Sequence, residues 1–366
     1  MLFFEVISMT VNQVVMYILA FGAALGGLDC LLGNRFGYGE KFERGFQMLG
    51  PVALSMAGII CLAPVMSVLI NVVIGPVCRL VHWDPAIFGT ILAIDMGGCQ
   101  LSVDLAQDSA FGLFCGVIIS SIFGCTLVFS IPVGLGFLKE EDRPYFTRGI
   151  LLGLCSMPVS IIASCVALKL ELGYVLWSCM PVFLLSALLA VGIAKKPDQM
   201  IRGFQAFARF IRCVAIFGLM IAAVSHLTGF TIIPGMLSLG ESMQTVSAIC
   251  IVMLGSMPLA ELIQRLMKAP FRYIDRTIGL NGASTTSLLL SFFSATPALA
   301  LVSQMNRRGQ VVISACLVSI TNIFGAHFAY ANTYYPDMVP AMMVAKVAGG
   351  VTAFAIAMIA TRNLKE

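Results

Sequence analysis

The residues best suited to chemistry lie inside an apolar run, GTILAIDMGGCQLSVDLAQDS (89–109). Asp95 is followed, after Met96, by Gly97 and Gly98, and a further acid, Asp104, comes nine residues after Asp95. Two adjacent glycines permit a tight turn and a close approach of the backbone to a ligand. The pattern predicts a broken helix with a carboxylate at the break, which suits the binding of a small cation.

A second apolar stretch, 281–305, is interrupted at Ser294-Ala295-Thr296-Pro297. Proline lacks a backbone N–H and disfavours helical backbone in the residue before it. The hydroxyls of Ser294 and Thr296 could accept a hydrogen bond from an ammonium or contact a substrate hydroxyl. They could equally bond back to helical carbonyls, as such hydroxyls often do.

Further polar candidates lie in two other places. Gln100 and Asp104 share a helical face, because they are four residues apart, and could line a path. Asn322 and His327 are polar groups in the apolar segment ITNIFGAHFAYAN (320–332). An imidazole can carry a proton near neutral pH or simply be satisfied by its neighbours, and the sequence leaves both open.

The composition indicates whether water or lipid surrounds the protein that carries these groups. Hydrophobic residues make up 59% of the 366 and charged residues 11%, whereas soluble domains are about 25% charged. The mean hydropathy is +0.96. We expect a polytopic membrane protein, whose net charge of +4 reflects basic residues at cytoplasmic helix ends rather than nucleic-acid binding. The 12 cysteines include no C-x-x-C and read as small buried residues, so no metal or cofactor is expected.

Apolar runs predict about nine transmembrane helices, since each approaches the ~20 residues that cross a bilayer core. The first should be retained, because MLFFEVISM has no basic n-region and contains Glu5. The nine spans are 13–32, 46–74, 110–136, 149–170, 174–194, 205–229, 244–265, 309–331 and 339–361.

The two interrupted stretches, about 84–108 and 281–305, are expected to be re-entrant hairpins rather than spans. With neither crossing, nearly all basic loops fall on one face, among them 34–44, 139–148, 195–202 and 264–276. The positive-inside rule then places the N-terminus outside and the C-terminus in the cytoplasm.

An internal repeat accompanies this topology. APVMSVLINVVIGP and MPLAELIQRLMKAP have the same proline spacing, and each precedes an interrupted stretch. We expect an inverted-topology repeat with one unit at 1–170, a linking helix at 171–200 and a second unit at 201–366. Inverted repeats with broken helices meeting near the midplane are typical of secondary transporters.

Two packing features were also expected. Gly22-x-x-x-Gly26 forms a small-residue face for helix packing and leaves a homo-oligomer open. Glu261 and Arg265 lie one helical turn apart and should form an ion pair.

An ionised Asp95 inside the bilayer costs at least ~2.5–3.5 kcal/mol without a partner. A cationic substrate is one partner. The alternatives are that Asp95 caps the second half of the hairpin, or pairs with a basic residue of another segment, such as Lys346 in the last span.

The sequence resembles the ethanolamine permease family of bacterial ethanolamine-utilisation operons over nearly its whole length. The segments that carry the resemblance are GEKFERGFQMLGPVALSMAGIICLAPV, GTILAIDMGG, TLVFSIPVGLG, IRGFQAFARF, RRGQVV and HFAYAN. The resemblance implies import of ethanolamine, a small primary ammonium with one hydroxyl. Ser294-Ala295-Thr296-Pro297 and Ala326 depart from the family pattern, which leaves a related small amine as an alternative.

A transporter, working by facilitated diffusion or coupled to an ion or proton, is therefore the expected function. The site residues are expected to be Asp95, Gly97, Gly98, Gln100, Asp104, Ser294, Thr296, Asn322 and His327. A membrane-embedded enzyme is the remote alternative, because H-E-x-x-H and similar patterns are missing. A sensor should carry a soluble domain, and the longest polar stretch is about a dozen residues.

Overall fold

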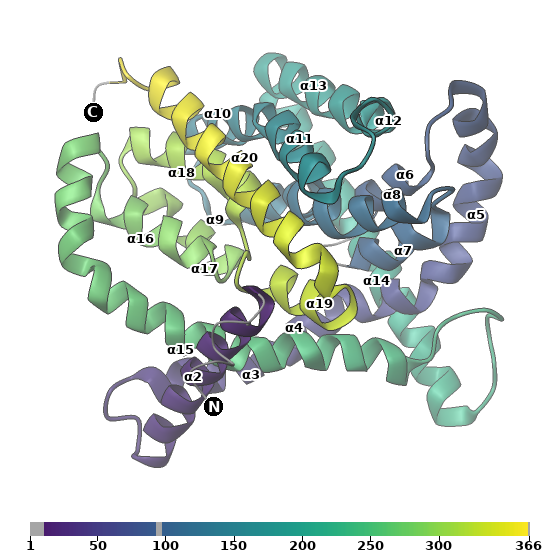
Figure 1. Cartoon of the computed structure of the whole chain (residues 1–366), viewed down its shortest axis with the longest axis horizontal. Coiled ribbons are helices and arrows are strands. Elements are labelled where there is room, and N and C mark those ends of the chain that lie inside the picture. The colour runs from purple at the N-terminus through teal and green to yellow at the C-terminus, as the bar shows by residue number, and fades with distance from the viewer. Residues whose placement is uncertain (1–10, 93–96, 365–366) are drawn as a thin grey trace.

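The computed structural model describes residues 11–92 and 97–364, and these ranges are helical with turns and without strands (Figure 1). Seven segments in this part of the chain are long and apolar enough to cross a membrane. An eighth is added if Leu172–Ser178 and Met180–Leu189, bent by 46°, form one span. The expected class, an all-α polytopic membrane protein, is confirmed.

The elements up to residue 168 are α2 (Val11–Leu31), α3 (Tyr38–Gln47), α4 (Leu49–Val52), η2 (Ala53–Ala57), α5 (Gly58–Val81), α6 (Ala86–Leu92), α7 (Gly97–Leu105), α8 (Ser109–Leu113), η3 (Phe114–Gly124), η4 (Thr126–Ser130), α9 (Ile131–Phe137), α10 (Arg143–Cys155) and α11 (Met157–Leu168). The elements that follow are α12 (Leu172–Ser178), α13 (Met180–Lys195), α14 (Pro197–Thr228), α15 (Leu239–Ile278), α16 (Gly282–Ser291), α17 (Ala295–Ala300), η5 (Val302–Gln304), α18 (Arg307–Ile320), α19 (Ala326–Tyr334), η6 (Pro336–Met338) and α20 (Val339–Ala360).

The largest differences from the sequence-based expectations lie in two regions. The basic tract 264–276, expected as a loop, continues α15 as helix to Ile278. The expected span 309–331 is divided into α18 and α19 by a non-helical segment at 321–325. Backbone freed by such a break is tolerated at membrane depth only where protein or a cavity satisfies it, so the break marks a place to look for a site.

The segment 109–137 is the central helix of the molecule. Within it, 94% of the most apolar window is buried, and η3 and η4 are π-helical. Single π-turns inside α-helices often occur at functional sites. This segment packs against both interrupted regions of the chain, through Thr90 of α6 and Cys99 of α7 on one side and Val318 of α18 on the other.

The outer surface is apolar where a membrane protein meets lipid. Val68, Leu69, Val72 and Val73 of α5 are each 66–69% exposed, and Val351 of α20 is 62% exposed. A soluble protein rarely exposes so extensive an apolar surface.

The small-residue face of α2 is covered within the chain. A Cβ on Gly22 would overlap the Gly255 carbonyl oxygen of α15, and one on Gly26 would lie 2.7 Å from the ring of Pro258. The close helix packing expected of Gly22-x-x-x-Gly26 is therefore confirmed, and α15 is its partner. In Figure 1, α2 and α3 lie against the long α15 at the lower left.

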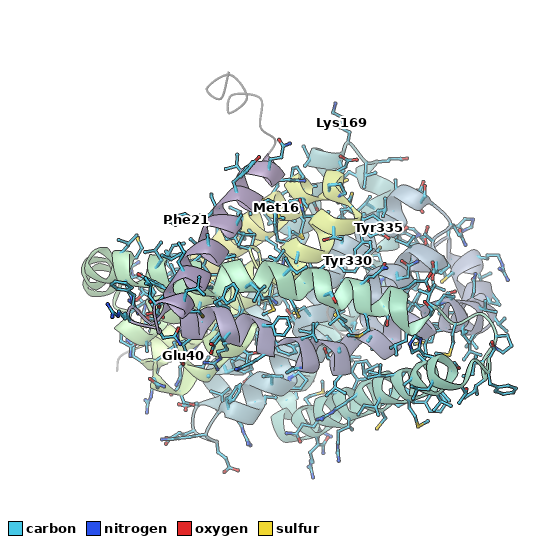
Figure 2. The ribbon with its side chains drawn as sticks, turned by 90° about the horizontal axis from the view of Figure 1, so that it is seen from below. Met16, Phe21, Glu40, Lys169, Tyr330 and Tyr335 are labelled. Carbon is cyan, nitrogen blue, oxygen red and sulfur yellow. The ribbon has the colours of Figure 1, made fainter. Side chains whose placement is uncertain are left out.

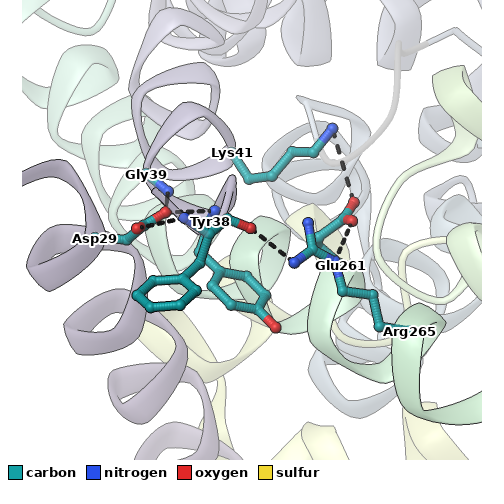
Figure 3. A network of polar contacts seen from close by, with 7 residues as sticks. Asp29, Tyr38, Gly39, Lys41, Glu261 and Arg265 are labelled. Carbon is teal, nitrogen blue, oxygen red and sulfur yellow. Dashed lines mark hydrogen bonds and ion pairs between the residues drawn. The ribbon is translucent and has the colours of Figure 1, made fainter. Parts of the chain in front are cut away.

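Polar contacts also stabilise the packing of α2 and α3 against α15 (Figure 3). Asp29, 2% exposed, accepts hydrogen bonds from the backbone N–H groups of Phe36, Tyr38 and Gly39. The expected Glu261–Arg265 pair is confirmed, with Arg265 Nε 2.8 Å from Glu261 Oε1. Arg265 also donates to the Phe36 carbonyl oxygen, so the loop after α2 is tied to α15.

Candidate functional site

The first interrupted stretch forms a helical hairpin whose two ends are held together by one buried carboxylate. Asp84, 1% exposed, accepts from Ala86 N at 2.9 Å at the start of the hairpin. It also accepts from Gln107 N and Asp108 N at its end, at 3.1 and 3.0 Å, and from the Tyr174 hydroxyl at 3.0 Å. We call these contacts the Asp84 clasp.

The second interrupted stretch is closed in the same manner by two asparagines. Asn281 Nδ2 donates to the Gln304 carbonyl oxygen at 2.8 Å, and Asn306 Nδ2 donates to that of Gly279 at 3.1 Å. Each asparagine also caps the helix that follows it, α16 and α18 respectively. We call these contacts the asparagine clasp.

The break of the second hairpin pairs with the break between α18 and α19. Asn322 N donates to the Ser291 carbonyl oxygen and Phe324 N donates to that of Phe292, both at 2.8 Å. Asn322 adopts the left-handed conformation with φ 58°, which asparagine tolerates better than most residues. Gly325 lies so close to Phe293 that a Cβ would overlap its carbonyl oxygen. Two non-helical segments far apart in sequence thus satisfy each other's backbone groups inside the protein.

A buried lysine and histidine adjoin these breaks. Lys346 and His327 are both 0% exposed. Lys346 Nζ lies 3.0 Å from His327 Nδ1 and 3.0 Å from the carbonyl oxygens of Ser121 and Thr321, with that of Ser319 at 3.4 Å. With its hydrogen on Nε2, His327 accepts from Lys346 at Nδ1; in the other tautomer Nδ1 donates to the Thr321 carbonyl oxygen, 3.1 Å away.

The first hairpin reaches the same region through α19. The side chains of Cys99 in α7 and Tyr330 in α19 are neighbours. Tyr330 begins a cluster of three tyrosines, with ring centroids 5.1 Å from Tyr334 and 6.3 Å from Tyr335. Figure 2 shows Tyr330 and Tyr335 close to each other beside α15. Aromatic faces attract cations, so the C-terminal end of α19 offers aromatic groups suited to an ammonium.

The structure brings several of the expected site residues together. Asn322, His327 and Ser294 are buried around the paired breaks, and Thr296 follows in the first turn of α17, half-buried. Gly97 and Gly98 begin α7. Asp95 lies outside the described residues.

Two of the expected residues lie on α7, the second helix of the first hairpin. Gln100 Nε2 donates to Asp104 Oδ1 at 2.8 Å, which confirms their shared helical face. The Asp104 side chain is exposed. Asp108 caps α8 by accepting from Phe111 N at 2.8 Å.

Sequence reasoning missed Asp84 and underrated Lys346. Asp84 precedes Pro85 at a helix start, where aspartate commonly forms a turn with the N–H two residues on. Lys346 is a lone charge within the 22 residues of α20, and such residues default to function. Ser121 and Ser319 contact Lys346 through their backbone carbonyl oxygens, and no pattern of side chains in the sequence predicts such contacts.

Changing Asp84 to asparagine should destabilise the first hairpin. The amide has one acceptor oxygen where the carboxylate has two, and its NH₂ would face the N–H groups of Gln107 and Asp108. Hydrogen bonds to charged groups contribute ~1.5–3 kcal/mol each, so the Tm of purified protein in detergent should fall by several degrees. Asp104→Asn is the matched control, because Asp104 is exposed and should change the Tm little. An equal Tm for both variants would contradict the role of the clasp.

These features define a class: a multi-pass α-helical membrane protein in which interrupted helices meet around buried polar groups. Residues 11–360 match the family model described as "Ethanolamine utilisation protein, EutH". The chain belongs to this family.

Relatives cover nearly the full length of the chain. It is 38% identical over 350 residues to an uncharacterized protein, YxeR, of Bacillus subtilis, with 95% of each chain covered. It is 34% identical to a probable ethanolamine permease of Listeria monocytogenes, covering 98% of this chain and 96% of that one. A protein of the same name from Escherichia coli is 32% identical, with 96% of each chain covered. No solved structure matches the chain.

Proposed function

We propose that this protein is a permease that imports ethanolamine, or a closely related small amine, across the bacterial inner membrane. The observation that carries the proposal is the pairing of two helix breaks beside buried Asn322, His327 and Lys346. Broken helices that meet near the bilayer midplane are a recurrent way of building substrate sites in transporters. The names of the Listeria and E. coli relatives point to the same substrate.

The proposed substrate fits the polar groups by its chemistry. Protonated ethanolamine has an ammonium, for which Asp95 would be the counter-ion, and a hydroxyl, for which Ser294, Thr296 and Asn322 offer partners. Gly97 and Gly98 would permit close approach at the tip of the first hairpin. Gln100 and Asp104, with the neighbouring tyrosines, would form the outer entrance.

We propose nine spans with two re-entrant hairpins in an inverted repeat, with units at 1–170 and 201–366 joined by 171–200. The two clasps support opposite entry of the hairpins. The Asp84 clasp includes Tyr174, which follows α11. Gln310, near the asparagine clasp, donates to Asp142, which precedes α10. The clasps therefore adjoin opposite ends of the span 143–168.

The orientation follows from the charges at these two ends. Arg148 donates to the Ala360 carbonyl oxygen at the end of α20, and Arg307 lies over the Tyr145 ring, so basic loops gather beside the asparagine clasp. The positive-inside rule then makes this face cytoplasmic, with the C-terminus inside and the N-terminus outside.

Uptake of labelled ethanolamine by proteoliposomes tests the proposal directly. The wild-type protein should show saturable uptake, reduced by excess unlabelled ethanolamine. Runs with and without an imposed pH gradient separate facilitated diffusion, in which the gradient does not drive accumulation, from proton coupling. Absence of saturable uptake in both conditions defeats the proposal.

Asp95→Asn should reduce uptake by ~10-fold or more, equivalent to ~1.4 kcal/mol of lost interaction, while leaving the Tm nearly unchanged. Asp337→Asn changes an exposed aspartate of η6; this variant is the control and should transport normally. If Asp95 instead pairs structurally with Lys346, Asp95→Asn will lower the Tm, and adding Lys346→Met will restore it. That restoration would refute the counter-ion role.

A further inference from the structure

The environment of Lys346 Nζ is a coordination site in its own right. The ammonium sits among three backbone carbonyl oxygens and one imidazole nitrogen, at 3.0–3.4 Å. These ligands come from three separate elements: Ser121 from η3, Ser319 and Thr321 from the end of α18, and His327 from α19. Lys346 itself reaches them from α20, and no part of its side chain is exposed.

The chemistry of these ligands favours a cation. Helix α18 ends at Ile320, so the carbonyl groups of its last turn have no N–H partner in the next turn. The C-terminal end of a helix also carries the negative end of its dipole. A positive charge placed there satisfies the carbonyl groups and the dipole together.

We infer that this group of ligands is a monovalent-cation site at the end of α18, which Lys346 fills with a tethered primary ammonium. In transporters built from broken helices, unwound carbonyl groups and helix C-termini of this kind bind the coupling Na⁺. Here the cation is covalently part of the chain. The site should therefore take Na⁺ or a small alkylammonium once the lysine ammonium is removed.

The inference also predicts uptake that does not depend on Na⁺, and this consequence rests on the proposed permease function. The existence of the cation site does not rest on that function. A simpler role for Lys346, as a link between α20 and α18, accounts for the contacts equally well but predicts no response of any variant to a specific cation.

Two substitutions separate these roles. Lys346→Ala removes the ammonium and leaves space among the same ligands, whereas Lys346→Met fills that space with an uncharged chain of similar length. The Tm of the purified full-length protein is measured in NaCl, methylammonium chloride and choline chloride at equal ionic strength. Methylammonium replaces the missing end of the lysine, and choline is too bulky to enter.

We expect Lys346→Ala to be less stable than wild type in choline chloride and to regain Tm, in a saturable manner, with Na⁺ or methylammonium. The wild type and Lys346→Met should not respond to Na⁺, and their response to methylammonium, which can also occupy the substrate site, should be smaller than that of Lys346→Ala. The inference is overturned if Lys346→Ala shows no cation-specific rise, or if Lys346→Met shows the same rise. Because the measurement needs no substrate, it decides the cation site even for a protein that takes up no ethanolamine.

Wild-type uptake gives a second measurement in case Lys346→Ala does not fold. Replacing Na⁺ on both sides of the proteoliposome membrane by tetraethylammonium, which has neither an N–H nor a hydroxyl group, should leave ethanolamine uptake unchanged. A requirement for Na⁺ would overturn the inference, because the position for a coupling cation is already occupied by Lys346.

Discussion

Replacing Gly325 with valine is expected to abolish transport. A Cβ at this position overlaps the Phe293 carbonyl oxygen, and backbone atoms cannot rotate away as a side chain can. The two breaks would have to separate, which removes the Asn322–Ser291 and Phe324–Phe292 hydrogen bonds. Overpacking alone costs ~1–3 kcal/mol, and unpaired buried backbone groups add ~1–3 kcal/mol each. Proteoliposome uptake should fall by more than ~100-fold, since every ~1.4 kcal/mol is tenfold.

Gly203→Val is the matched control. Gly203 lies on α14, where a Cβ meets no atom within 4 Å. The Tm and uptake of Gly203→Val should therefore stay close to those of the wild type. Gly325→Ala should fall between the two, because the first added carbon already makes the contact. Normal uptake by Gly325→Val would show that the paired breaks are not needed for transport.

Replacing His327 with leucine should have the second-largest effect. Leucine has a similar volume, but it offers no acceptor in place of His327 Nδ1, which lies 3.0 Å from Lys346 Nζ. A hydrogen bond to a charged group contributes ~1.5–3 kcal/mol. The expected results are a Tm several degrees lower and uptake reduced ~10-fold or more.

His327→Asn tests whether the acceptor matters rather than the ring. The asparagine Oδ1 lies close to the position of the imidazole Nδ1, so this variant should retain more Tm and more uptake than His327→Leu. Equal losses in the two variants would argue that the ring itself, and not the Nδ1 acceptor, is what the site requires.

The sequence was a good guide to this fold where hydrophobicity acts over a whole helix. Expected spans such as 13–32, 110–136 and 339–361 correspond to helices at Val11–Leu31, Ser109–Phe137 and Val339–Ala360. Lipid selects long apolar helices, so length and composition carry most of the information. The Glu261–Arg265 pair could also be predicted from the sequence, because side chains at positions i and i+4 are neighbours on the surface of a helix.

The sequence was a poorer guide where backbone meets backbone. The break at 321–325 lies in an apolar run without proline, and it is stabilised by hydrogen bonds to residues about thirty positions earlier. Local propensity cannot encode such partners. The ligands of Lys346 were hidden for the same reason, since carbonyl oxygens occur at every residue and only the fold selects which of them converge.

The contact of α2 with α15 has a mechanical consequence. Gly22, Gly45 and Gly255 bring the backbones of α2 and α3 directly onto α15 with no side chain between them. Interfaces without intervening side chains cannot slide by changing rotamers. We therefore expect these three helices to move together as one rigid unit, so that the hinges of a transport cycle lie elsewhere in the chain.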